Sequence, residues 1–398
     1  MLPIEEAIDR VLAGVQPVRE NEVVRLREGA GRVTGADIRA IRTQPDFDAS
    51  AMDGYAVRAT DTQTQRTLRL IGESAAGRRF DGVVGFGECV RIFTGAPMPF
   101  GADAVVLQED VDRADDSVML RSSTQTGRHV RPRGNDFTSG DLLVPLGSRL
   151  RAASVALVAS GGHPDVVVCR QPKVGILSTG DELVRPGQPV GPDQIVASNV
   201  YGIAALAEGA GASVIDLGIV GDRMEELDRC LHEAFAAQID ILVTIGGASV
   251  GDHDLVASGL QMHGVTLDFM KVAMRPGKPL MAGRYGRTRV LGLPGNPASS
   301  LVTATVFLVP LIRRMQGYEH TSCRESGRLA CDLPPNDHRT EFMRARLDVT
   351  GDGARIEPLA RQDSSLLSIF AQADALLVRP ANAPKASAGD RCEYIRLA

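Results

Sequence analysis

Several features that mark other protein classes are missing from this sequence of 398 residues. No run of 18 consecutive apolar residues occurs, so a simple membrane-spanning helix is excluded and we expect no membrane association. The opening stretch, MLPIEEAIDR, carries acids where a signal peptide carries bases, so we expect a cytoplasmic protein. An excess of positive charge is also missing. The formal net charge is -5, which argues against broad nucleic-acid binding.

Metal-binding and nucleotide-binding signatures are missing too. The six cysteines stand far apart and form no CxxC pair, so we expect reduced, mostly packed thiols and no zinc site. No Walker lysine–serine pair is present, and no GxGxxG follows a first strand. These absences argue against a standard P-loop and against a dinucleotide site.

From Pro172 onward, strand-like and helix-like segments alternate. We expect strands at 173–177, 213–220, 240–245 and 289–293, and helices at 199–208, from Asp222 to 237, at 256–263 and at 298–315, with a bend at Pro310. This alternation predicts a parallel, doubly wound α/β sheet. In such sheets, ligands bind beyond the carboxyl ends of the strands.

Two other regions consist of short strand-like runs broken by Gly, Pro and Asp. In the first, between about residues 45 and 140, we expect strands at 83–84, 90–93, 104–107 and 117–120. In the second, after about residue 319, we expect strands at 328–333, 342–349, 375–379 and 393–396. The chain is long enough for two to four domains, so these runs predict a β-rich insertion and a small β domain at the end.

Four glycine-rich loops follow or flank the predicted strands: LSTGDEL (177–183), TIGGASVGDHDL (244–255), MRPGKP (274–279) and LPGNPASS (293–300). Three of them close strands that should be parallel, so they should gather on one edge. Glycine lets a ligand approach the backbone closely, and the helix that opens in LPGNPASS offers N–H groups and Ser299 to an anion. Arg275 and Lys278 add positive charge. Any one of these loops is as consistent with an ordinary turn as with a binding loop, but the four loops together favour a binding site.

Acids accumulate at the same loops. Five acids lie at or near them: Asp181, Glu182, Asp222, Asp252 and Asp254. Carboxylates repel a phosphate unless a metal stands between them, and Mg²⁺ bound by one or two carboxylates plus phosphate oxygens removes the conflict. Each acid is also compatible with a helix cap or a solvated loop, and we expect Asp222 to cap its helix.

The β-rich insertion carries three further motifs: SAMDGYAV (50–57), RIFTGAPMPFGADAVV (91–106) and RPRGND (131–136). Taken in order with the four loops, they resemble the MoeA family of molybdopterin molybdenumtransferases, which includes the E domain of gephyrin and its plant counterparts. The resemblance covers about residues 45–315. It continues more weakly in RQDSSLLSIFAQADALLVRP (361–380).

The resemblance implies an architecture and a reaction. Members of this family insert molybdate into adenylylated molybdopterin and release AMP, and Mg²⁺ assists. They are elongated homodimers, with the site in a cleft between the α/β domain of one chain and the inserted domain of the other. The expected domains are a linking domain (1–45 and 140–171), an inserted β-rich lid domain (46–139), an α/β molybdopterin-binding domain (172–318) and a C-terminal small β-barrel domain (319–398). Other proteins of cofactor biosynthesis are left open as partners.

The resemblance also implies roles for residues. The implied catalytic residues are Asp53, Thr94, Asp136, Glu182, Asp222 and Asp254, of which Glu182 and Asp254 are the expected Mg²⁺ ligands. The implied substrate-binding residues are Ser178, Thr179, Gly180, Asp181, Gly246, Gly247, Ser249, Gly251, Arg275, Lys278, Pro294, Gly295, Asn296, Pro297 and Ser299. The sequence departs from the family pattern at Ala248, His253, Leu255 and Arg275. At Arg275 a planar fork replaces a lysine, so the anion geometry there should differ.

Two alternatives stay open at this point. A molybdopterin adenylyltransferase of the MogA type shares the α/β domain, but it would lack the motifs before Pro172 and after Glu319, and it would consume ATP. A dimeric scaffold of the gephyrin type would bind peptides without chemistry. The acids retained at the loops favour catalysis over this second alternative.

Overall fold

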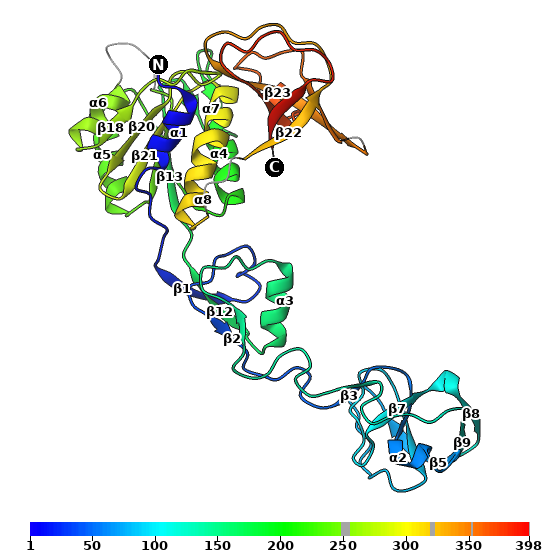
Figure 1. Cartoon of the computed structure of the whole chain (residues 1–398). Helices are drawn as coiled ribbons and strands as arrows, with labels where there is room; N and C mark the ends of the chain where they lie inside the picture. The colour runs from blue at the N-terminus through cyan, green and yellow to red at the C-terminus, as the bar shows by residue number, and fades with distance from the viewer. Residues whose placement is uncertain (248–254, 319–322, 352, 398) are drawn as a thin grey trace. The chain divides into compact units, whose positions relative to one another are not determined.

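The computed structural model describes residues 1–247, 255–318, 323–351 and 353–397. The chain divides into two compact units, Asn21–Val168 and a second unit made of Met1–Glu20 with Cys169–Ala398 (Figure 1). The domain boundaries given above stay predictions.

The centre of the second unit is a six-stranded sheet. Its order is β16 (Ser213–Val220), β13 (Lys173–Thr179), β17 (Ile241–Ile245), β21 (Thr288–Leu293), β20 (Met281–Tyr285) and β18 (Thr266–Phe269). The first four strands are parallel, as predicted. β20 runs antiparallel to β21 because the two strands form a hairpin whose short turn contains Gly286 at a φ of 56°. The sheet is therefore mixed, and the sequence reading had missed β18 and β20.

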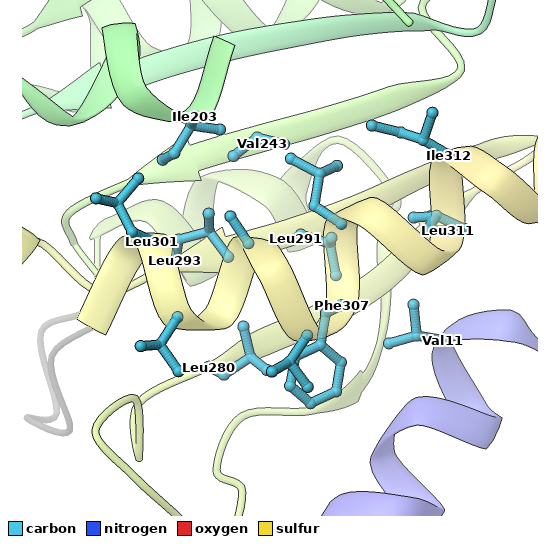
Figure 2. Packing of buried hydrophobic residues seen from close by; sticks show 14 of the residues in the cluster. Val11, Ile203, Val243, Leu280, Leu291, Leu293, Leu301, Phe307, Leu311 and Ile312 are labelled. Carbon is cyan, nitrogen blue, oxygen red and sulfur yellow. The ribbon is translucent and has the colours of Figure 1, made fainter. Parts of the chain in front are cut away.

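Helices cover both faces of this sheet, so the expected double winding is confirmed (Figure 1). One face carries α1 (Ile4–Leu12), α4 (Asn199–Gly209), α7 (Pro297–Thr303) and α8 (Val309–Met315), and the other carries α5 (Met224–Ala236) and α6 (Leu255–Met262). Figure 2 shows Phe307 beside Val11 of α1, and both belong to one apolar cluster with strand residues such as Leu291. Apolar side chains from sequence-distant segments thus form one core.

The predicted helix at 298–315 is present as a continuous helix, Pro297–Met315, but it is not uniform. Between α7 and α8 lies a π-helical segment, Ala304–Leu308, in which Val309 N–H donates to the carbonyl of Ala304. Pro310 is the second residue after this segment. Its ring excludes a normal α-helical turn before it, which explains the wider segment at the expected bend. This helix is long and apolar enough to cross a membrane. However, 83% of its apolar 18-residue stretch is buried inside the protein, as in the core helix of a globular domain.

One predicted helix start is wrong. Asp222 does not cap α5, because the residue before the helix is Arg223, at a φ of -127°, and no side chain caps it. The chain is still extended at Arg223, so Asp222 lies one residue too early to reach the free N–H groups. Its role is described with the site below.

A closed five-stranded barrel follows α8, as the resemblance implied. Its strands are β22 (Arg324–Leu329), β24 (Gly353–Pro358), β23 (Thr340–Thr350), β25 (Ala375–Arg379) and β26 (Arg391–Arg396), and β26 pairs with β22 to close it. The short β19 (Met274–Arg275) pairs in parallel with β23. The barrel is therefore joined to the α/β part through the segment that contains MRPGKP. The turn at Leu366 leads into α9 (Leu367–Phe370). In the α/β part, the short strand β14 (Leu183–Val184) pairs with β15 (Ile195–Val196).

The first unit contains a second six-stranded sheet. Its order is β7 (Ala104–Leu107), β4 (Gly54–Val57), β6 (Glu88–Ile92), β5 (Thr67–Ser74), β9 (Ser117–Leu120) and β8 (Val111–Ala114). The predicted strand at 83–84 is only an isolated bridge from Val83 to Phe100. Smaller elements complete the unit: β1 (Asn21–Arg25), β2 (Ile38–Arg39), β3 (Ala49–Ser50), α2 (Ala59–Thr62), η1 (Gln108–Asp110), β10 (Val130–Arg131), β11 (Leu142–Val144), α3 (Ala152–Ser160) and β12 (Asp165–Cys169).

Candidate functional site

The carboxyl ends of three parallel strands lie level in the α/β sheet. Ser178 of β13 pairs with Ile245 of β17, and Ile245 pairs with Leu293 of β21. The loops LSTGDEL, TIGGASVGDHDL and LPGNPASS therefore start side by side, which confirms that they gather on one edge. The N–H of Gly246 donates to the carbonyl of Leu293 at 3.1 Å, so two of the loops are also bonded to each other.

Glycine is required where these loops meet. Gly246 has a φ of 90°, and a Cβ built on it would lie 2.6 Å from the carbonyl oxygen of Thr179. A Cβ on Gly295 would lie 3.7 Å from the Cα of Gly246, so the second and fourth loops approach backbone to backbone. Gly180, at a φ of 145°, opens the first loop. The edge therefore presents peptide groups with little side chain above them, and a ligand can contact the backbone directly.

The acids at this edge have different surroundings. Asp181 accepts a 3.1 Å hydrogen bond from the N–H of Asp222, which ties the loop after β13 to the loop after β16. Glu182 folds back so that its Oε2 would lie 2.4 Å from a Cβ on Gly180. Glu182 and Asp222 are both exposed, and neither forms an ion pair within the described residues. These two carboxylates are thus available to a ligand, whereas Asp181 supports the loops.

The residues predicted for the second loop are only partly covered by the structure. Gly246 and Gly247 are described, but Ser249, Gly251 and Asp254 lie outside the described residues. So do Ala248, Asp252 and His253. A Cβ on Gly247, whose φ is 64°, would lie 2.3 Å from Cγ2 of Val256, so this glycine also allows α6 to begin close to the loop.

The LPGNP loop leads into α7. Asn199 donates to the carbonyl of Gly295 at 2.7 Å, and Pro297 occupies the first turn of the helix, where its missing N–H is tolerated. The N–H of Ala298 donates to the carbonyl of Ser364 at 3.0 Å. One of the free N–H groups at this helix end is therefore satisfied by the segment that precedes α9. Ser299 is buried, Pro294 is buried, and Asn296 is exposed.

The MRPGKP segment carries one paired and one exposed cation. Arg275 Nη2 lies 2.7 Å from Glu341 Oε2, and Nη1 lies 3.5 Å from Asp337 Oδ2. The hydrogen bond to Glu341 raises the pKa of Arg275. Much of the charge of Arg275 is thus balanced by acids of the barrel, as a planar fork allows. Lys278 is exposed, and a Cβ on Gly277 would lie 2.5 Å from Thr303 of α7, so this segment packs against the long helix.

Sequence reasoning missed a buried arginine next to this edge. Arg344 of β23 is 1% exposed, and its Nη2 donates to the carbonyl of Asp363 at 3.0 Å. Its Nε has no partner within the described residues, and burial lowers its pKa. Ser300 of α7 likewise has a buried Oγ that finds no partner among the described residues. The strand pattern could have revealed this arginine. Arg344 is two residues after the buried Phe342, so both side chains point to the same, inward face of the strand, where an arginine is rare.

The predicted acids of the first unit lie directly before the start of β4 and in the RPRGND segment. Asp53 Oδ1 accepts bonds from both the N–H and the Oγ1 of Thr94, each at 2.7 Å. The backbone bond from Thr94, then its hydroxyl, lowers the pKa of Asp53. Asp136 is exposed, and its N–H donates to the carbonyl of Gln44 at 3.0 Å. Asp53 and Thr94 therefore form one unit, and no hydrogen bond among the described residues joins Asp136 to them.

The carboxylates at this edge determine whether Mg²⁺ fits the site. No group of three His, Cys, Asp or Glu side chains able to hold a metal occurs among the described residues. Mg²⁺ retains waters and takes one or two carboxylates together with substrate phosphates, so a complete protein cage is not required. The exposed, unpaired carboxylate of Glu182 at a phosphate-accessible backbone edge fits such a partial donor set.

Comparison with known proteins covers nearly the whole chain. Residues 2–162 match the MoeA N-terminal region (domain I and II), residues 175–314 match a probable molybdopterin binding domain, and residues 326–397 match the MoeA C-terminal region (domain IV).

Individual relatives agree with these matches. The molybdopterin molybdenumtransferase of Haemophilus influenzae is 35% identical over 98% of this chain and 97% of its own length. The molybdopterin molybdenumtransferase of Bacillus subtilis is 33% identical over 95% of this chain and 90% of its own length. The crystal structure of a molybdopterin biosynthesis MoeA protein from Pyrococcus horikoshii is 28% identical and covers 100% of both chains with a TM-score of 0.82. The chain therefore belongs to the MoeA family of molybdopterin molybdenumtransferases, which are transferases of molybdenum cofactor biosynthesis.

Proposed function

We propose that this chain inserts molybdate into adenylylated molybdopterin, with cleavage of the adenylyl ester and release of AMP. The observation that carries the proposal is the level edge formed by the loops after β13, β17 and β21. It offers bare peptide groups at Gly180, Gly246 and Gly295 beside the free carboxylates of Glu182 and Asp222. A phosphoanhydride needs close backbone approach, and its negative charge needs a cation between it and the acids.

Mg²⁺ is part of this proposal. Glu182 and Asp254 would hold the ion against the bridging phosphates, and when bound the ion neutralises charge as the phosphoanhydride breaks. Asp181 keeps the loop of Glu182 in place through its bond from the N–H of Asp222. The glycines exclude side chains from the edge, so the ester can lie close to the peptide groups.

The molybdate oxyanion needs donors of its own. We assign this role to the start of α7, which the segment of Asp363 and Ser364 links to Arg344. Arg344 and Ser300 each carry a buried polar atom without a partner in the described chain. Buried donors of this kind are rarely left unpaired, and a bound oxyanion would satisfy them. Lys278, exposed on the segment that packs against α7, would supply further charge.

In this proposal, the acids of the first unit complete the site of a second chain in a homodimer. Asp53, Thr94 and Asp136 of one chain would serve the α/β edge of a second chain in a homodimer, in the cytoplasm. Substrate would come from other enzymes of cofactor biosynthesis.

A mixed dimer tests this arrangement. Chains with Asp53→Asn and chains with Asp254→Ala, carrying different tags, are coexpressed, and the doubly tagged species is purified. If the site combines two chains, the mixed dimer regains one intact site and about half of the wild-type AMP release, while each homodimer retains only a small residual rate. A mixed dimer as inactive as the two homodimers would place all the acids of a site on one chain.

The reaction itself is tested by a single-turnover assay. Purified protein is mixed with adenylylated molybdopterin, Mg²⁺ and molybdate, and AMP is followed by chromatography. We expect AMP release that requires molybdate, and we expect Asp254→Ala to fold normally and to release no AMP. Consumption of ATP with unadenylylated molybdopterin would indicate an adenylyltransferase. Tight binding without AMP release would indicate a scaffold.

A further inference from the structure

A small network lies behind the pair formed by Asp53 and Thr94. Leu107 of β7 pairs with Gly54 of β4, and Gly54 pairs with Ile92 of β6, so these three residues form one row across the sheet. The next row is Gln108, Asp53 and Phe93. The N–H of Gln108 donates to the carbonyl of Asp53 at 3.3 Å, which extends the pairing of β4 and β7 into this row.

The side chain of Arg91 crosses the same end of the sheet. Arg91 lies directly opposite Tyr55 on the neighbouring strand. Its Nη1 donates to the carbonyl of Gly54 at 3.1 Å, and its Nη2 donates to Oε1 of Gln108 at 2.6 Å. Its guanidinium carbon lies 5.2 Å from the ring centroid of Tyr55 and 4.9 Å from that of Phe93. The guanidinium is thus fixed by two hydrogen bonds and two aromatic rings.

We propose that Arg91, anchored by Gln108, is a positioning residue for Asp53. This inference rests on the proposed function, in which Asp53 acts on the substrate. The carbonyl that Arg91 binds belongs to Gly54, the residue directly after Asp53, and the carbonyl of Asp53 itself is held by Gln108. Arg91 therefore acts on the backbone that carries the carboxylate, while Thr94 fixes the carboxylate directly.

The residue type supports this role. A lysine in place of Arg91 keeps the charge but has no planar fork, so it cannot reach Gly54 and Gln108 together while lying over two rings. An arginine needed only for surface charge would not require this geometry. Arg69 of the same sheet differs from Arg91 in both respects. Its side chain is 71% exposed, and among the described residues it forms an ion pair only with Glu88.

The test compares Arg91→Lys with the matched control Arg69→Lys in steady-state AMP release. We expect Arg91→Lys to lower kcat by about ten- to a hundredfold, the scale of a misplaced catalytic group, with KM changed less than about twofold. Arg69→Lys should leave both constants unchanged. Gln108→Ala, at an exposed position that folding should tolerate, should lower kcat by a smaller factor, about two- to fivefold, because Arg91 retains its bond to Gly54.

A double-mutant cycle separates positioning from a structural role. If Arg91 acts through Asp53, Arg91→Lys in the Asp53→Asn background changes kcat by less than about twofold, because the residue it positions is already disabled. Additive losses of the residual rate would overturn the inference, as would full activity of Arg91→Lys beside an Asp53→Asn variant that has lost most of its activity. If Arg91→Lys does not fold, Gln108→Ala replaces it in the cycle under the same criteria. Full activity of Asp53→Asn would overturn the proposed role of Asp53 as well.

Discussion

Replacing Gly246 with alanine tests whether bare backbone at the strand ends is what the site requires. At this position two constraints coincide. The φ of 90° is a conformation that side-chain-bearing residues rarely adopt, and the added Cβ would lie 2.6 Å from the carbonyl oxygen of Thr179 and 3.1 Å from its hydroxyl. The nearest obstacle is a backbone atom of β13, so rotation of a side chain does not relieve it.

The magnitude follows from these two terms. Holding a non-glycine residue in a sparsely populated backbone region costs about 1–3 kcal/mol. Moving the end of β13 away from the new methyl group adds a penalty of the kind seen in overpacked sites, about 1–3 kcal/mol. We expect a total near 2–6 kcal/mol, which corresponds to a fall in Tm of about 4–24 °C for a unit of this size. Because Thr179 leads into Gly180, the displacement should also raise KM for the adenylylated substrate by about tenfold.

The assay combines thermal unfolding with AMP release at a temperature where the variant is folded. Gly209→Ala is the matched control, since Gly209 lies in α4 and an added Cβ there meets no atom within 4 Å. Alanine is the better helix former, so this control should be neutral or more stable by up to about 1 kcal/mol. A Gly246→Ala variant with the Tm and KM of the wild type would refute the reasoning.

Two further predictions concern stability. Phe307→Ala removes a ring that is 1% exposed in the core of the α/β part, so it should lower the free energy of unfolding by about 3–5 kcal/mol, measured as a lower urea midpoint. Val349→Ala, at an exposed position, should change the free energy of unfolding by less than about 0.5 kcal/mol. The hydrogen bonds from Arg339 lower the pKa of Asp337 from 3.8 to about 2. Because the pKa of Asp337 is lower in the folded state, its ionised carboxylate stabilises the fold at pH values above the pKa of the unfolded chain. This stabilisation is lost as the pH falls through about 2. Asp337→Asn should therefore be less stable than wild type near pH 7, with the difference in Tm narrowing between about pH 4 and pH 2. A difference that is constant over this range would contradict the assignment.

Local patterns were enough to predict the parallel core of the sheet. The strands expected at 173–177, 213–220, 240–245 and 289–293 are present as β13, β16, β17 and β21, because each is a short apolar run between turn or helix signals. The gathering of their glycine loops follows from parallel pairing alone. The strands that were missed, such as β4, β20 and β24, are short or mixed in polarity, and only their neighbours in a sheet stabilise them.

Features that depend on distant segments could not be read from the sequence. A capping box was a reasonable prediction for Asp222, but the start of α5 is set by how the chain leaves β16, and the N–H of Asp222 is held by Asp181 instead. The sequence predicts that Arg275 adds positive charge for substrate binding, and it does not show that the pairing of β19 with β23 brings Arg275 to Glu341.

The sequence by itself determined the family, the order of the motifs and the strand ends at which the site lies, because these depend on residue type and short-range spacing. Only the tertiary structure decided which groups meet there. The carbonyl of Ser364 at the start of α7, and the buried Arg344 beside it, come from a barrel far along the chain. The bonds from Arg91 to Gly54 and Gln108 depend likewise on three strands being in register. Contacts of this kind are set by packing and register, which no local pattern encodes.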